Sequence, residues 1–193
     1  MKICVYGAAS STIDPEYIEK VEKLGKEMAK RGHSLVFGGG GNGLMGAVAR
    51  GIRAGGGKIL GVIPQFFEEE SVEAIYPYCD ELLQPETMRE RKQIMEDNAD
   101  AFIIVPGGIG TYEEFFEILT LKQLCRHNKP IAMYNIKGYY DELLVALERA
   151  TEKNFIRGGC KELFFVSEEE NELLRYIETP VGEKRNVKDL KDG

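Results

Sequence analysis

Three glutamates follow a glycine-rich segment that comes directly after a short apolar run. The run "AFIIV" leads into "PGGIGT" (106–111), and Glu113, Glu114 and Glu117 follow. Glycines at the start of a helix let backbone N–H groups converge on an anion, most often a phosphate, and the helix dipole favours that anion. Residues three and four apart share a helix face, so some of these carboxylates must point to the same rim. The spacing indicates a phosphate site with carboxylates beside it.

The carboxylates also have a structural explanation. A single glutamate in the first turn of a helix is favoured by the dipole alone. However, Glu114 and Glu117 flank the apolar positions Phe115 and Ile118, which is an unusual place for two acids whose only role is solvation. We therefore favour a functional role for them.

A second glycine-rich segment, "GGGGNGLMG" (38–46), follows the apolar run "HSLVF". It contains a G-x-G-x-x-G pattern, but the dinucleotide fingerprint belongs after the first strand and needs an acidic residue at the end of the next one. Here the next run, "KILGVI", ends in Pro64 and Gln65, and neither glycine segment is a Walker A motif. Glycines that only permit tight turns and close packing are the structural alternative. Two such loops on one rim favour a mononucleotide phosphate.

Cations precede the central apolar run in "ETMRERKQIM". Arg89, Arg91 and Lys92 cannot all lie on one helix face, and a solvated face is the simplest explanation for them. Yet a chain that binds a phosphate with a net charge of −7 needs some well-placed cations. A planar guanidinium suits an anion or the edge of a purine.

Apolar runs alternate with amphipathic stretches along the chain, an order that requires crossover connections and a parallel sheet covered on both faces. The predicted fold is an α/β, Rossmann-like three-layer sandwich in a single domain, residues 1–178, followed by a polar, disordered tail, 179–193. Asp14 and Pro15 are expected to start the first helix. We expect strands at 2–6, 33–37, 58–63, 80–84, 101–105, 130–135 and 163–167, and helices at 14–31, 43–55, 87–99, 111–126, 139–155 and 168–178.

Composition narrows the function classes. The net charge of −7 disfavours binding to nucleic acid or an anionic membrane. The four cysteines form no C-x-x-C pair and the two histidines show no zinc spacing, so we expect reduced thiols and no metal. No apolar run is long enough to span a bilayer, and the N-terminus lacks a signal-peptide core. A cytoplasmic location is expected.

The motifs in this order resemble the LONELY GUY (LOG) family, the cytokinin riboside 5′-monophosphate phosphoribohydrolases. "PGGIGTYEE" is similar to that family's P-G-G-x-G-T-x-x-E signature, "GGGGNGLMG" to its other glycine loop and "MRERK" to its M-x-x-R-K segment. The resemblance covers residues 2 to about 178. Many relatives carry the label lysine decarboxylase, but nothing in this sequence singles out a lysine for a Schiff base.

The resemblance implies hydrolysis of the N-glycosidic bond of a nucleoside 5′-monophosphate, by a homodimer that needs no cofactor. It implies that Arg91 and Glu114 are the catalytic pair. The positions that it assigns to substrate binding are Gly107, Gly108, Gly110 and Thr111 for the 5′-phosphate, helped by Gly39, Gly40 and Gly43, with Met88, Lys92 and Glu117 in the same cleft.

The sequence does not identify the base of the substrate. AMP and an N6-substituted AMP such as a cytokinin ribotide are both plausible, and the segment "PQFFEEESVEAIYPYC" (64–79) is expected to border the base. At the positions of Arg89 and Ile109, many plant-like members of the family have other residues. The alternative from another class is a nucleotide-binding protein or a molybdenum-cofactor carrier without hydrolysis, which would not need the pair Arg91 and Glu114.

Overall fold

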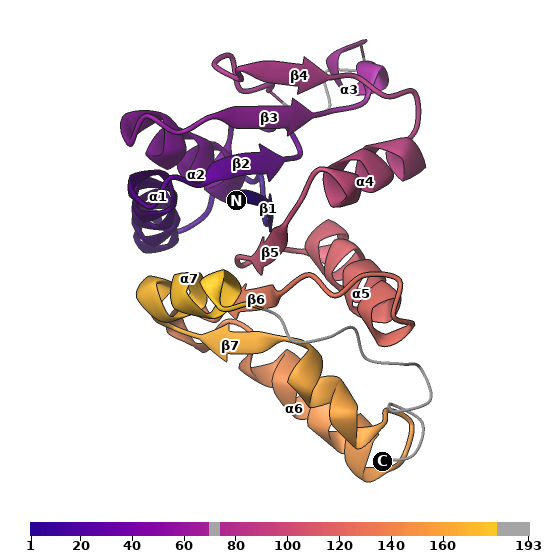
Figure 1. Cartoon of the computed structure of the whole chain (residues 1–193). Coiled ribbons are helices and arrows are strands. Elements are labelled where there is room, and N and C mark those ends of the chain that lie inside the picture. The colour runs from indigo at the N-terminus through magenta and orange to yellow at the C-terminus, as the bar shows by residue number, and fades with distance from the viewer. Residues whose placement is uncertain (70–73, 181–193) are drawn as a thin grey trace.

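The computed structural model describes residues 1–69 and 74–180, and its centre is one seven-stranded sheet in which all neighbouring strands are parallel. The strand order is β4-β3-β2-β1-β5-β6-β7 (Figure 1). The strands are β1 (Lys2–Tyr6), β2 (Ser34–Phe37), β3 (Ile59–Val62), β4 (Glu81–Leu83), β5 (Ala101–Ile104), β6 (Ile131–Tyr134) and β7 (Phe165–Ser167). The predicted parallel α/β fold is confirmed.

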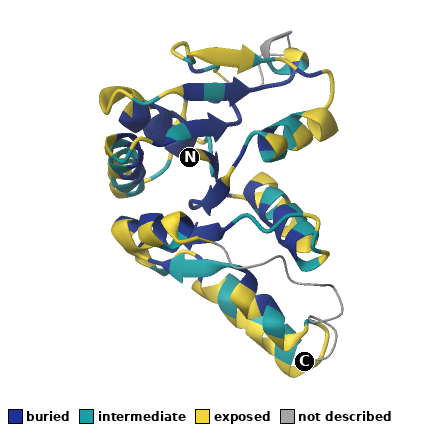
Figure 2. Ribbon diagram, viewed as in Figure 1, coloured by how far each residue is buried: buried dark blue, intermediate teal, exposed yellow. Residues whose placement is uncertain are grey.

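Helices cover both faces of the sheet. The helices α1, α2 and α7 pack on one face and α4, α5 and α6 on the other, as Figure 1 shows, so the three layers are confirmed. The helix bounds are α1 (Pro15–Lys30), α2 (Gly43–Ala54), α3 (Gln65–Glu69), α4 (Met88–Asp97), α5 (Ile109–Gln123), α6 (Asp141–Glu152) and α7 (Glu170–Glu178). The central strands are buried between these layers (Figure 2).

Local signals in the sequence set the helix starts. Asp14 caps α1 by accepting a hydrogen bond of 3.0 Å from the amide of Glu16, with Pro15 at the first helical position, as predicted. Thr87 and Glu90 form a capping box at the start of α4, which fixes the helix that carries the predicted cations.

Some elements differ from the prediction. Helix α5 begins at Ile109, earlier than expected, and the short helix α3 and two 3₁₀ turns, η1 (Ile136–Gly138) and η2 (Gly158–Leu163), were not anticipated. Helix α7 ends at Glu178. Most of the tail that was predicted to be disordered, residues 181–193, lies outside the described part of the chain. None of the helices in the described ranges is both long and apolar enough to cross a membrane.

The order of the strands decides where a ligand can bind. The chain adds strands on one side of β1 and then returns to add β5 on its other side, so the order reverses between β1 and β5. Tyr6 and Ile104 are paired at the carboxyl ends of these two strands, and the amide of Val105 donates to the carbonyl of Tyr6 at 2.9 Å. In open parallel sheets the crevice at such a reversal is the usual ligand site.

Candidate active site

Arg91 and Glu114 meet across the space between α4 and α5 at this crevice. The Nη1 atom of Arg91 lies 3.9 Å from the Oε1 atom of Glu114, and their side chains are only 12% and 11% exposed. Both line a small cavity that reaches the ends of β1 and the Gly38–Gly40 loop. The structure therefore brings together the two residues that were predicted to be catalytic.

Backbone groups hold the guanidinium of Arg91 in place. Its Nε atom donates to the carbonyl of Val62 at 3.1 Å, at the end of β3. A Cβ atom added to Gly38 would stand 1.9 Å from Nη2, so a larger residue at this position would displace the guanidinium. The ring of Phe67 lies on another side, 5.8 Å from the guanidinium carbon to the ring centroid. Neither the role of Val62 nor that of Gly38 was predicted from the sequence.

Glu114 lies in surroundings that disfavour its charge. Burial raises the pKa of its carboxyl to about 7, and this effect outweighs the guanidinium of Arg91, which lowers the pKa. Glu113 and Glu117 raise the pKa further, whereas Lys92 lowers it. A carboxyl that titrates near neutral pH can accept or release a proton under ordinary conditions.

Lys92 pairs with the other two carboxylates of α5. Its ammonium forms ion pairs with Glu113 and, at 2.5 Å, with Glu117. Although burial lowers the pKa of Lys92, its hydrogen bonds to Glu113 and Glu117 raise it on balance. The lysine is therefore a fixed cation between α4 and α5, and Glu114 is left as the carboxylate that faces Arg91.

The amino terminus of α5 is open. Within the described residues no side chain caps it, and its first positions, Gly108, Ile109 and Gly110, are exposed. An added Cβ at Gly108 or Gly110 would meet no described atom within 4 Å, and neither glycine has a positive φ. Protein packing thus gives no reason for glycine at these positions. Unsatisfied N–H groups beside open space are what an anion requires.

Two tyrosine hydroxyls hold the loop that precedes α5. The hydroxyls of Tyr139 and Tyr140 donate to the carbonyls of Gly107 and Val105 at 2.8 and 2.7 Å. The side chain of Thr111 is buried beside Gly107, and a Cβ at Gly107 would stand 2.1 Å from its hydroxyl oxygen. The carbonyl groups of the loop are thereby occupied, and the N–H groups at the helix start stay available.

The second glycine loop is arranged differently. The amides of Leu44 and Met45 at the start of α2 donate to the carbonyl of Ala8 at 2.8 and 3.3 Å, so protein already occupies this helix terminus. Gly43 has a φ of +54° and packs on the backbone of Ala8 to Ser10. Gly39, with a φ of +80°, accepts a hydrogen bond from the amide of Tyr76. Gly40 lines the cavity beside Arg91 and Glu114.

The remaining predicted positions lie at the edge of the site. Met88 is the first residue of α4, 38% exposed, with its sulfur 3.9 Å from Nη1 of Arg91. Ile109 is 88% exposed at the start of α5. The predicted base-bordering segment, 64–79, is described only in part, because residues 70–73 lie outside the described ranges.

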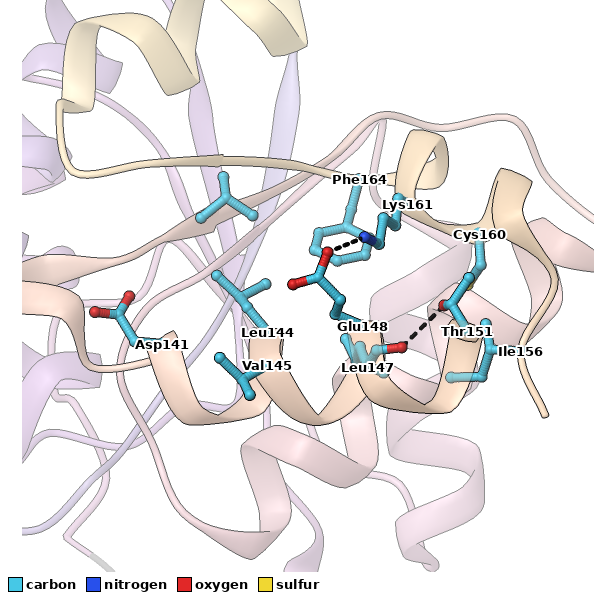
Figure 3. A pocket seen from close by; sticks show the side chains of 11 residues that line it. Asp141, Leu144, Val145, Leu147, Glu148, Thr151, Ile156, Cys160, Lys161 and Phe164 are labelled. Carbon is cyan, nitrogen blue, oxygen red and sulfur yellow. Dashed lines mark hydrogen bonds and ion pairs between the residues drawn. The ribbon is translucent and has the colours of Figure 1, made fainter. Parts of the chain in front are cut away.

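A larger cavity than the one beside Arg91 and Glu114 lies elsewhere in the described part of the chain. It measures about 520 Å³ and runs between α6, η2 and β7, with the ion pair of Lys161 and Glu148 at its side (Figure 3). Its lining is mostly apolar, and it belongs to the sheet edge rather than to the crevice between β1 and β5. Size alone therefore does not identify the reactive site here. Within residues 1–69 and 74–180, no three His, Cys, Asp or Glu side chains are placed to hold a metal ion.

Comparisons with known proteins agree with these motifs. A family model described as "Possible lysine decarboxylase" matches residues 45–177. The chain is 37% identical over 177 residues to the cytokinin riboside 5′-monophosphate phosphoribohydrolase LOG7 of Arabidopsis thaliana, covering 92% of this chain and 81% of that one. It is 39% identical over 172 residues to the probable phosphoribohydrolase LOG4 of Oryza sativa subsp. japonica, covering 89% and 74%.

Among solved structures, the molybdenum cofactor binding protein from Rippkaea orientalis is similar to this chain. The TM-score is 0.67 at 18% identity, with 92% of this chain and 94% of the other covered. At this identity the likeness concerns the fold alone.

Proposed function

The chain belongs to the LOG family of cytokinin riboside 5′-monophosphate phosphoribohydrolases, and on that premise we propose that it hydrolyses the N-glycosidic bond of a nucleoside 5′-monophosphate. The products are the free base and ribose 5-phosphate. The observation that carries the proposal is the contact of Arg91 with Glu114, whose carboxyl titrates near pH 7, one helical turn beyond an uncapped helix terminus.

The phosphate end of the substrate is assigned to α5. We propose that the N–H groups of Gly108 and Gly110 and the hydroxyl of Thr111 hold the 5′-phosphate, with Gly107 giving Thr111 its room. Glu114 lies four residues beyond Gly110, about 6 Å along the helix axis, which is the scale of one ribose. A bound phosphate therefore fixes the sugar against the carboxylate.

The second glycine loop and the edge residues complete the proposed site. Gly40 lines the cavity opposite α5, we propose that Gly39 beside it helps to hold the phosphate, and Gly43 keeps the β1 loop close to α2. Met88 borders the base beside Arg91. Lys92 and Glu117, which pair with each other, adjust the pKa of Glu114: the lysine lowers it and the glutamate raises it.

The reaction follows from the charges that develop. As the C1′–N9 bond breaks, its electron pair goes to the base and positive charge builds on the ribose. Ionised Glu114 stabilises that positive charge and takes a proton from the water whose oxygen bonds to C1′. Arg91 stabilises the electron pair on the leaving base, which takes a proton from solvent, while Glu114 releases the proton that it accepted to solvent. Because arginine holds its proton too tightly to be a good acid, its role is electrostatic.

The decarboxylase description fits the site poorly. A Schiff-base lysine needs a neutral, nucleophilic amine, which proteins obtain by lowering its pKa. Lys92, the lysine of this cleft, is instead ion-paired with two glutamates that raise its pKa on balance. Its chemistry is that of a permanent cation.

We also propose that the protein acts as a homodimer. Phe116 on α5 and Leu124, which caps the carboxyl end of α5, are 38% and 48% exposed, and Thr120 between them is exposed as well. Residues at this spacing share one face of a helix, which is apolar here and open to solvent. Sedimentation of the wild type and of Leu124→Glu tests this: a dimer that the variant dissociates is expected, and a wild-type monomer would contradict it.

The function is tested with pure protein and three compounds: AMP, N6-isopentenyl-AMP and adenosine. We expect base release from at least one monophosphate and none from adenosine, because adenosine lacks the group that α5 binds. The ratio of the two monophosphate rates identifies the preferred base. For the carrier alternative, mass spectrometry of ligands released from the purified protein is expected to show a pterin, and nucleotides are expected to stay intact.

A further inference from the structure

The cavity between α6, η2 and β7 has no part in the proposed reaction. Leu144 and Phe164 belong to its apolar lining, and the ion pair of Glu148 and Lys161 lies at its side (Figure 3). Its volume of about 520 Å³ is within the range of pockets that bury a whole ligand, roughly 300–1,000 Å³. Helix α6, described in full over 141–152, has no buried residue, and its Val145 is 45% exposed. The apolar face of an amphipathic helix normally packs on a partner.

Phe155, just after the end of α6, is 85% exposed. Its backbone is fixed, because Asn154 has a φ of +61° and the amide of Phe155 donates to the carbonyl of Ala150 at 2.9 Å. At this kind of helix end, an apolar residue in the position of Phe155 commonly packs back on the last turn. Phe155 is instead held open to solvent, next to Ile156, which lines the cavity. An exposed aromatic side chain and an apolar cavity therefore lie side by side.

This region adjoins the face of α5 that is proposed above for the homodimer. The ring of Phe164 in the cavity wall contacts the ring of Phe115 on α5, with 5.4 Å between the ring centroids. The next residue along α5, Phe116, belongs to the proposed dimer face. Helices α5 and α6 also cover the same face of the sheet (Figure 1). A second copy that packs on α5 is therefore placed to reach the cavity.

Building on the proposed homodimer, we propose that the cavity receives Phe155 of a second copy of this chain. Because Phe155 and the cavity are neighbours, a twofold axis lets each copy fill the cavity of the other, and one contact accounts for both features. An aromatic side chain that fills a pocket is a typical centre of a protein interface.

The charges at the two ends of α6 favour this pairing. The first turn of the helix is acidic, with Asp141 and Glu142, and Lys153 caps its carboxyl end. When the α6 helices of two copies lie antiparallel, the acidic start of each faces the basic end of the other. Such complementarity favours a second copy of this chain over a partner without these charges.

Phe155→Ser tests the contact at a position where the fold does not depend on the side chain. Leu82→Ser is the matched control, because Leu82 is 40% exposed on β4, the opposite edge strand of the sheet. In sedimentation we expect Phe155→Ser to raise the dissociation constant of the dimer at least tenfold and Leu82→Ser to leave it unchanged.

A fluorescent reporter gives a second readout, since the chain has no tryptophan. In Phe155→Trp the emission should shift to shorter wavelength, and acrylamide quenching should fall, as the protein concentration rises through the dissociation constant. The same reporter combined with Leu124→Glu should stay solvent-exposed at every concentration.

The outcomes separate the two proposals. A wild-type dimer that Leu124→Glu dissociates and Phe155→Ser does not, or a Phe155→Trp dimer with a solvent-exposed indole, overturns the contact and leaves the homodimer standing. A wild-type monomer overturns both.

Discussion

The Nη1 atom of Arg91 and the Oε1 atom of Glu114 are 3.9 Å apart, although both side chains are nearly buried. This distance is too long for a hydrogen bond, which in proteins spans about 2.7–3.2 Å. Opposite charges in a dry site would gain by closing that gap, yet the guanidinium is held by its hydrogen bond to the carbonyl of Val62, in the space that Gly38 leaves open. The arrangement leaves both groups able to act on a ligand between them.

Glu114 is expected to reduce the stability of the folded protein above neutral pH. Burial raises its pKa from 4.5 to about 7, so between these values the folded state binds more protons than the unfolded state. The stability that this provides is complete below pH 4.5 and is lost as the pH rises through 7. Glu114→Gln should therefore increase the free energy of unfolding at pH 8, by up to about 3 kcal/mol, and change it little at pH 4.5.

Urea unfolding at the two pH values measures this effect. Glu148→Gln is the control, because Glu148 is exposed and pairs with Lys161, which lowers its pKa, so its removal brings no gain at pH 8. A Glu114→Gln protein that is less stable than the wild type at pH 8 would contradict the raised pKa.

The pH dependence of kcat/KM should report Glu114 in the free protein. Because the mechanism needs the carboxylate, activity falls as the pH drops through about 7. Lys92 lowers the pKa of Glu114 and Glu113 raises it, so Lys92→Met should move this acid limb to higher pH and Glu113→Gln to lower pH. Burial also raises the pKa of Glu96 to about 7. If the acid limb moves in Glu96→Gln instead, the limb reports Glu96 and not Glu114.

Gly38 is expected to matter for activity through Arg91. An alanine there would place its Cβ 1.9 Å from Nη2 and push the flexible guanidinium aside. We expect Gly38→Ala to lower kcat/KM by about 100-fold, the size of effect that follows a 1 Å misplacement, with little change in Tm. The double variant with Arg91→Ala should be no worse than Arg91→Ala alone, because both changes remove the same interaction. Fully additive losses would argue against this coupling.

A substitution at Gly110 is expected to change stability and phosphate binding in opposite directions. Its added Cβ meets no described atom, and alanine in a helix is favoured over glycine by about 0.5–1 kcal/mol. Gly110→Ala should therefore raise Tm slightly and still weaken binding of inorganic phosphate and AMP at least tenfold in calorimetric titration. Gly158→Ala, at an equally open position in η2, should leave phosphate binding unchanged. Unaltered phosphate affinity in Gly110→Ala would remove α5 as the phosphate site.

The fold could be predicted because its signals are local. Alternating apolar runs and amphipathic stretches gave the parallel sheet, and Asp14 with Pro15 gave the start of α1. The meeting of Arg91 with Glu114 could also be expected, since the motifs that carry them flank one strand, β5.

Other features depend on residues that are distant in sequence. Gly38 and Ala8 look like ordinary loop residues until the fold brings the guanidinium of Arg91 against the first and the start of α2 against the second. For the same reason the two glycine loops looked equivalent, and only tertiary hydrogen bonds distinguish the open terminus of α5 from the occupied terminus of α2.

The central claim is that Glu114 carries out N-glycosidic hydrolysis of a nucleoside 5′-monophosphate. The most direct test measures free base and ribose 5-phosphate from AMP and N6-isopentenyl-AMP, with wild type and Glu114→Gln prepared side by side. The account predicts equal amounts of both products from the wild type and at least 1,000-fold slower release from a folded variant that still binds the nucleotide. Release at the wild-type rate by Glu114→Gln would contradict it.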